Sequence, residues 1–342
     1  IISATFVYSQ YFFASGTALY LVATIACALA DSGGMLIAAR LLQALGGCCG
    51  TVVGRVIVRD RFQEAEQVSY LSWMSSGMAL SPVVAPLIGS VIDVALGWRW
   101  VFVVLAVVAA GVLLALCTVV PETQPGRYGP AHLAGEDDRE HSVQPGLLRL
   151  YLSLLHDRHF LRHSLIISAI YCTYFPFVAE SSLVLQRSLG LSQVQYAGVF
   201  ALTILGYLGG ASVFGAWGAE GVIGRALRLN LLFAVVWAAA TLMFPGSLLA
   251  IVLPMMPIML SVGMSIPACQ FAVMQPHAGA VGAVSGLFFF IQMAVTALFG
   301  LVVATLSDGS PAPMVGVSLV ASVLAWGAAW VFPARTDDTH HA

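Results

Sequence analysis

The stretch WVFVVLAVVAAGVLLALCTV, residues 100–119, has the composition of a membrane-spanning segment. It contains twenty consecutive residues without a single Asp, Glu, Lys, Arg or His. A helix needs about 20 mostly apolar residues to cross a hydrocarbon core of about 30 Å. The stretch therefore predicts a transmembrane helix.

The composition of the whole chain agrees with a membrane environment. Of the 342 residues, 59% are hydrophobic and 9% are charged, whereas a soluble domain carries about 25% charged residues. A water-soluble fold with so few charges would expose a large apolar surface and aggregate. The net charge of −2 and the lack of a basic run give no indication of a nucleic-acid partner.

Nine further segments have the same apolar character. The chain is therefore predicted to be an all-α polytopic membrane protein, with four helices in an N-terminal bundle over residues 1–120 and six in a C-terminal bundle over 162–333. A cytoplasmic loop over 121–161, containing a short amphipathic helix at Leu147–Leu155, and a cytoplasmic tail over 334–342 complete the prediction. The ten segments run approximately over residues 11–30, 35–58, 68–93, 99–119, 163–186, 194–217, 225–244, 247–271, 278–306 and 312–332.

The arginines predict the orientation, because loops that stay in the cytoplasm are enriched in basic residues. If the first segment starts in the cytoplasm, eleven arginines fall at cytoplasmic ends and three at outer ends. Both termini are then cytoplasmic. The outer arginines are Arg40, Arg99 and Arg187.

Glycines recur four residues apart in three of the segments. Small residues at this spacing let two helix backbones approach closely, which drives helix association in lipid. The pattern predicts tight helix contacts at these places. The glycines are Gly46, Gly50 and Gly54, Gly206 and Gly210, and Gly282 and Gly286.

Several short motifs, taken in order, resemble those of the major facilitator transporters. Arg40–Gly46 (RLLQALG) is similar to the Arg-x-x-Gln-x-x-Gly motif of the family's fourth helix, and Ser81–Gly89 (SPVVAPLIG) to the antiporter motif of the fifth. The double-proline form of the second motif resembles the Bcr/CflA drug-resistance subfamily. Further matches to that subfamily are Arg59–Asp60, Trp98–Phe102, Pro121–Thr123, His159–Leu161 and Ala278–Ala280.

The resemblance aligns the ten segments with the family's helices three to twelve. The N-terminal bundle is then incomplete, and Val7–Tyr11 stands where the family has a basic loop between its second and third helices. The first-helix acidic residue that the family would assign to proton coupling has no counterpart. A truncated paralogue or remnant that does not transport is therefore one alternative for the function.

Arg40 is the first candidate for the chemistry, because an ionisable residue within a membrane span is a functional hypothesis by default. Gln43 and Gly47 share its helix face. The resemblance implies that these residues line the substrate and proton-coupling cavity. The alternative is that Arg40 extends its charged end to the outer interface.

Glu180 is the second candidate, and Thr173 and Phe177 lie on the same helix face at intervals of seven and three residues. The resemblance implies that this helix lines the cavity. There Glu180 would take up a proton near neutral pH and exchange it for a cationic drug. The alternative is an interfacial glutamate paired with Arg187.

Prolines interrupt two segments and are expected to bend them, because proline removes a backbone donor within a helix. The resemblance implies that the antiporter-motif helix seals a helix interface against proton leak, and kinking alone is the alternative. A second group, Pro254, Pro257 and Pro267, is expected to break the eighth segment. The antiporter-motif residues are Ser81, Pro82, Ala85, Pro86 and Gly89.

The function that the resemblance implies is secondary transport by rocker-switch alternating access, in which small amphipathic drugs or metabolites leave the cell in exchange for protons. This predicts a monomer in the lipid bilayer of the cell inner membrane, antibiotic resistance as the phenotype, and no cofactor or metal. An intramembrane enzyme is the other alternative. It is disfavoured because no His lies mid-span and no acidic pair shares a helix face.

Overall fold

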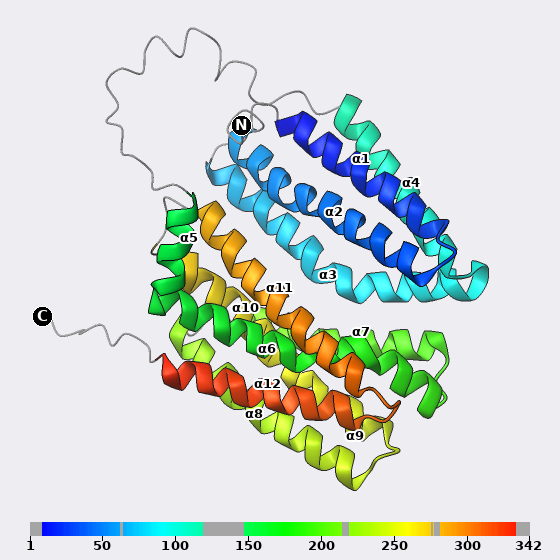
Figure 1. The fold of residues 1–342 in the computed structure, drawn as a ribbon, viewed down its shortest axis with the longest axis vertical. Helices are drawn as coiled ribbons and strands as arrows, with labels where there is room; N and C mark the ends of the chain where they lie inside the picture. Colours follow the sequence, from blue (N-terminus) through cyan, green and yellow to red (C-terminus); the bar gives the residue numbers. More distant parts are fainter. Residues whose placement is uncertain are drawn as a thin grey trace, which may run out of the picture. The chain divides into compact units, whose positions relative to one another are not determined.

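A computed structural model of the chain describes residues 9–61, 64–118, 147–213, 219–274, 276 and 281–332. Within these ranges the regular secondary structure is entirely helical, which confirms the all-α fold class (Figure 1). The chain divides into two compact units, residues 1–142 and residues 143–342. We refer to them as the N-terminal unit and the C-terminal unit.

The N-terminal unit consists of four helices, of which α1 is the most enclosed. It packs along both α2 and α4, and α3 contacts α2 and α4 less extensively (Figure 1). The helices are α1 (Ser9–Ala28), α2 (Gly33–Arg61), α3 (Glu64–Leu96) and α4 (Trp98–Thr118).

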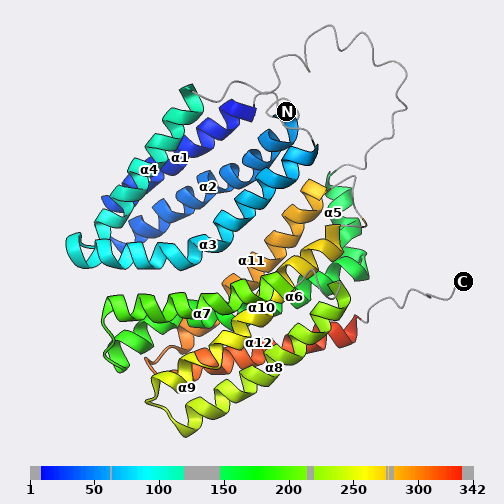
Figure 2. The same ribbon diagram turned by 180° about the vertical axis from the view of Figure 1, so that it is seen from behind.

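The C-terminal unit is built around α10, which packs against α6, α7 and α8, while α12 fills the space between α6 and α8 (Figure 2). Its core includes the fully buried side chains of Phe160, Trp237 and Phe288. The elements are α5 (Leu147–His156), α6 (Arg158–Ser182), the π-helix η2 (Leu183–Ser188), α7 (Gln193–Val213), α8 (Ala219–Met243), α9 (Leu248–Val252), α10 (Met255–Met274), α11 (Val281–Leu306) and α12 (Ala312–Val331).

Over the described residues each of the ten predicted segments is occupied by helix, and the short helix predicted at Leu147–Leu155 is present as α5. Seven helical stretches among the described residues are long and apolar enough to cross a membrane, and α1, α2 and α3 contain shorter apolar stretches. In the most apolar part of the α9–α10 stretch 67% of the residues are buried, against 11% in α4. The α9–α10 stretch is therefore central in the C-terminal unit, whereas α4 is largely uncovered by protein in the N-terminal unit.

The proline predictions are confirmed at one place and wrong at two others. The eighth segment is divided at Pro254, where α9 has ended at Val252 and α10 begins at Met255. Pro257 lies in the first turn of α10, where a backbone N–H has no partner within the helix, so it is tolerated. Pro267 lies inside α10, and the helix continues through it to Met274.

The predicted glycine contacts are found where two helices cross. A Cβ atom added at Gly46 would lie 2.5 Å from the Tyr20 backbone nitrogen, so α1 and α2 meet backbone to backbone. Cβ atoms at Gly206 and Gly210 would overlap carbonyl oxygens of α10. Gly50 and Gly286 are different, because a Cβ atom there would only touch a side chain, the Phe13 ring at 3.4 Å and the Tyr151 hydroxyl at 3.9 Å respectively. The surroundings of Gly54 and Gly282 lie outside what the structure describes.

Candidate functional site

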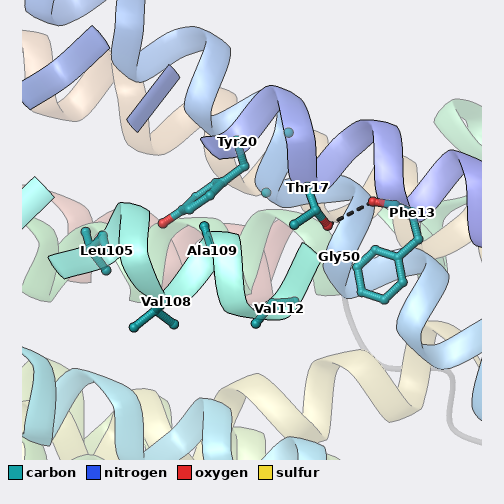
Figure 3. Close-up of a pocket in the computed structure, with 10 residues that line it drawn as sticks. Phe13, Thr17, Tyr20, Gly50, Leu105, Val108, Ala109 and Val112 are labelled. Atoms are coloured by element: carbon teal, nitrogen blue, oxygen red, sulfur yellow. Dashed lines mark hydrogen bonds between the residues drawn. The ribbon is translucent and has the colours of Figure 1, made fainter. Parts of the chain in front are cut away.

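The N-terminal unit contains a groove of about 360 Å³ between α1, α2 and α4 (Figure 3). Its walls are apolar side chains from α1 and α4, and its α2 side consists of glycines. The lining residues are Phe13, Thr17 and Tyr20 of α1, Gly46, Gly47 and Gly50 of α2, and Leu105, Val108, Ala109 and Val112 of α4.

The groove is open because Gly47 and Gly50 carry no side chains. A Cβ atom at Gly47 would have only ordinary contact with the Tyr20 ring, at 3.6 Å, and one at Gly50 would lie 3.4 Å from the Phe13 ring. Neither glycine is therefore required by helix packing, unlike Gly46. Both positions instead expose backbone to the groove, and larger residues there would fill it.

Tyr20 supplies the main polar group of the groove wall. Its ring extends from α1, and its hydroxyl points toward the part of α4 that carries Leu105 (Figure 3). None of the hydrogen bonds among the described residues involves this hydroxyl. Thr17, the other hydroxyl, donates to the Phe13 carbonyl oxygen at 2.8 Å. The Tyr20 hydroxyl is thus available to a ligand.

A polar chain links α2 to α1 next to the groove. The Arg40 Nη1 donates to Gln43 Oε1 at 2.7 Å, and the Gln43 Nε2 donates to Thr24 Oγ1 at 2.7 Å. Thr24 Oγ1 in turn donates to the Tyr20 carbonyl oxygen at 2.6 Å. Because Gln43 is only 4% exposed, its amide is fixed by these partners and holds the guanidinium in one orientation.

The guanidinium of Arg40 also lies over the ring of Phe102 on α4, with 5.2 Å between Cζ and the ring centroid. A cation above an aromatic face is attracted by the ring electrons. Arg40 therefore bridges α2 and α4.

The polar chain and the groove occupy successive turns of the same three helices. One turn from Gln43 along α2 lies Gly47, one turn from Thr24 along α1 lies Tyr20, and one turn from Phe102 along α4 lies Leu105. The site therefore has a cationic end and an apolar body.

Arg40 differs from the neighbouring Arg99 in having no anionic partner. Arg99 lies 3.6 Å from the Asp31 carboxylate and donates to the Ala30 carbonyl oxygen at 3.0 Å. Within the described part of the chain no carboxylate lies within 4.0 Å of Arg40. Arg40 is an exposed residue in this structure.

In the C-terminal unit, Thr173 and Phe177 lie in the packed interior. Thr173 is fully buried, and Phe177 packs against Phe200 and Trp237 with ring centroids 6.1 and 6.4 Å away. The exposed stripe of α6 includes Val178 instead. Neither predicted cavity residue reaches an open surface in this structure.

Glu180 lies near the end of α6 and is partly exposed. Its Oε2 accepts a hydrogen bond from Ser307 Oγ at 2.6 Å, just beyond the end of α11. The ion pair with Arg187 considered from the sequence is not among the contacts of the described residues. The carboxylate therefore links α6 to α11.

Sequence reasoning missed Asn230, which is the only asparagine of the chain and lies on α8. It is 1% exposed, and its Nδ2 donates to Thr173 Oγ1 at 3.0 Å and to Ser261 Oγ at 2.8 Å. Its Oδ1 accepts from Ser322 Oγ at 2.8 Å. One amide thus joins α6, α8, α10 and α12. The signal that could have found it is a lone amide within an apolar run.

The antiporter-motif helix is α3, which is helical through both prolines and changes direction along its length (Figure 1). Ser81 and Ala85 are exposed, Pro86 is partly buried, and a Cβ atom at Gly89 would meet nothing within 4 Å. The side chain of Pro82 lies outside what the structure describes.

Within the described residues, seven helical stretches are long and apolar enough to cross a membrane, and the N-terminal unit adds shorter apolar helices. This architecture is that of a multi-pass helical membrane protein. The sequence model of the Major Facilitator Superfamily matches residues 8–300. The chain belongs to this family.

Among curated proteins, the chain is similar to the multidrug resistance protein MdtL of Escherichia coli (strain K12 / DH10B), with 30% identity over 188 residues. The match covers 55% of this chain and 44% of the relative. MdtL of Shigella dysenteriae serotype 1 (strain Sd197) shows the same identity and coverage. The chain thus matches about half the length of these relatives.

Among solved structures, the fold is similar to a bacterial homologue of the human lysosomal transporter Spinster in an inward-facing, unoccupied conformation. The TM-score is 0.72 at 16% identity, over 97% of this chain and 85% of that one. A D-xylose-proton symporter gives a TM-score of 0.62 at 14% identity, over 93% and 80%. At these identities the likeness concerns the fold alone.

Proposed function

We propose that the protein is a secondary transporter of the Bcr/CflA type, which exports small amphipathic molecules in exchange for protons. The observation that carries the proposal is the groove of the N-terminal unit with the fixed guanidinium of Arg40 at its end. A mostly apolar cavity with one oriented polar group is the usual form of a small-molecule site. Membership of the family and the similarity to proteins named for multidrug resistance support it.

The proton in this scheme is carried by Glu180. Its carboxylate is held by a hydroxyl rather than by a cation, so protonation leaves no unpaired positive charge beside it. Protonation would remove the negative acceptor of the Ser307 hydrogen bond and weaken the link between α6 and α11. Proton uptake would in this way be transmitted to the end of α11.

Each unit moves as one body in this scheme. In the C-terminal unit, the Asn230 amide and the close contact of α7 with α10 support rigidity. In the N-terminal unit, the bent α3 with its antiporter motif would seal a helix interface against protons. Thr173 and Phe177 would hold the helix that carries Glu180.

The test is a drug-efflux assay in a pump-deficient bacterial host, comparing the natural chain with Glu180→Gln and Arg40→Gln. Expression of the natural chain should lower the accumulation of a lipophilic dye and raise drug tolerance. Both variants should lose at least tenfold in export rate at equal abundance in the membrane. Asp308→Asn is the matched control, because this carboxylate lies close in sequence to Ser307 and is fully exposed. Equal accumulation with and without the natural chain contradicts the proposal.

The proposed orientation, a monomer in the cell inner membrane with both termini in the cytoplasm, has a separate test. A green fluorescent protein fused after residue 342 folds and fluoresces in the cytoplasm, whereas an alkaline phosphatase there is active only outside. We expect fluorescence without phosphatase activity. The reverse result contradicts the orientation derived from the arginines.

A further inference from the structure

We infer that the groove of the N-terminal unit selects amphipathic carboxylates, with the carboxylate on Arg40 and the apolar body over Gly47 and Gly50. The inference rests on the proposed function, because it names the substrate class of the proposed transporter. It differs from the expectation of a cationic drug at Glu180.

The charge of the ligand follows from Arg40. A guanidinium has five N–H donors and no acceptor, and Gln43 is the only partner that binds one of them among the described side chains. Two adjacent donors can therefore accept a planar carboxylate side by side, which is the strongest arrangement of this pair. None of the residues lining the groove is acidic, so no group there compensates a cationic ligand.

The orientation of Arg40 is fixed before a ligand arrives. Gln43 holds one nitrogen and is itself anchored on Thr24 of α1, while Phe102 of α4 lies against the guanidinium face. A ligand that meets an oriented group loses less free energy in ordering it. These contacts occupy one edge and one face of the guanidinium and leave another edge open.

The length of the ligand follows from the helix geometry. Gly47 lies about 10 Å along α2 from Arg40, and Gly50 about 15 Å, at a rise of about 1.5 Å per residue. A carboxylate with two fused aromatic rings or a medium alkyl chain spans this distance. A polar substituent near the middle of such a molecule would find the Tyr20 hydroxyl.

The experiment measures binding rather than transport. The full chain is placed in nanodiscs of phosphatidylcholine, and three probes that share one apolar body are compared: 2-naphthylacetic acid, its neutral amide and 2-(2-naphthyl)ethylamine. Equilibrium dialysis against empty nanodiscs removes partition into lipid. We expect the acid to bind at least tenfold tighter than the amide and the amine.

Variants separate the charge from the groove. Arg40→Gln should reduce the ratio of acid to amide affinity to about one, and Arg40→Lys should leave it at an intermediate value, because lysine cannot pair bidentately. Gly47→Leu should weaken acid and amide alike and leave their ratio unchanged. Arg99→Gln is the matched control, because Arg99 is paired with Asp31 and does not line the groove, and it should leave the ratio unchanged.

A ratio near one in the natural chain, tighter binding of the amine, or a ratio that survives Arg40→Gln overturns the inference. Loss of acid binding when phosphatidylglycerol replaces phosphatidylcholine, with no change in export, assigns the site to a lipid headgroup and also overturns it. Acid-selective binding without export leaves the inference standing and contradicts the proposed function. Export without acid-selective binding contradicts the inference and leaves the proposed function standing.

Discussion

Replacing Asn230 with alanine removes three hydrogen bonds that join four helices of the C-terminal unit. The hydroxyl groups of Thr173 and Ser261 remain hydrogen-bonded after the change, because each also donates to a carbonyl oxygen of its own helix, at 2.7 and 2.6 Å. Ser322 loses its acceptor and must turn to a carbonyl oxygen one turn earlier in α12. No charged group is left unpaired by the change.

The expected loss of stability is moderate. Hydrogen bonds between membrane helices contribute about 0.6 kcal/mol on average, so three give about 2 kcal/mol. The space left by the amide adds a cavity term, and we expect a total of about 2–3 kcal/mol. For a domain of this size the thermal midpoint should fall by about 4–12 °C.

The assay is thermal unfolding of the purified protein in detergent, followed by the fluorescence of tryptophan. Two serines of α12 provide a matched pair, because both are fully buried and lie one turn apart. Ser322→Ala removes one of the three bonds to Asn230, and Ser318→Ala removes only a bond to the Met314 carbonyl oxygen of the same helix. The midpoint should fall in the order Asn230→Ala, Ser322→Ala, Ser318→Ala. A fall for Asn230→Ala no larger than that for Ser318→Ala contradicts a role for the Asn230 amide in holding the four helices together.

Three further changes have defined outcomes. Gly210→Ala should lower the free energy of unfolding by about 1–3 kcal/mol, because its Cβ would overlap the Leu260 carbonyl oxygen. Gly209→Ala is the control and should not lower the unfolding midpoint, because its Cβ would meet nothing within 4 Å. Equal midpoints would contradict the close crossing of α7 and α10. Phe102→Leu removes the ring under Arg40, and the affinity for 2-naphthylacetic acid should fall about 2–5-fold in the dialysis assay, corresponding to 0.5–1 kcal/mol. Asp31→Asn breaks an ion pair whose side chains are 50% and 93% exposed, so the midpoint should change by less than about 2 °C, and a larger fall would show that the pair is structural.

The fold class and the places of the helices could be predicted from the sequence because length and apolarity alone decide what crosses a bilayer. The break at Pro254 and the crossing at Gly210 were also predictable, since both depend on the residue type at one position. Pro267 was not, because α10 continues through it within a densely packed bundle that holds the helix together.

The candidate site was predictable only in part. Arg40, Gln43 and Gly47 were identified together because they share one helix face, and the structure places Gly47 in the groove and the other two beside it. The partners of Asn230 and Glu180 could not be identified, since Ser322 lies 92 residues from Asn230 and Ser307 lies 127 residues from Glu180. Such pairings depend on which helices become neighbours, which the spacing within one helix does not show.

The crossing of α7 and α10 restricts how the C-terminal unit can change shape. Gly206 and Gly210 of α7 meet carbonyl oxygens of α10, and Gly263 of α10 meets the Tyr207 carbonyl oxygen of α7, so each backbone fits into a gap in the other. Two surfaces that interlock in both directions cannot slide along each other without first separating. In any internal rearrangement of this unit, α7 and α10 must therefore move together as one rigid body. The bending must occur elsewhere, at the proline break before α10 or at the wider turn of η2.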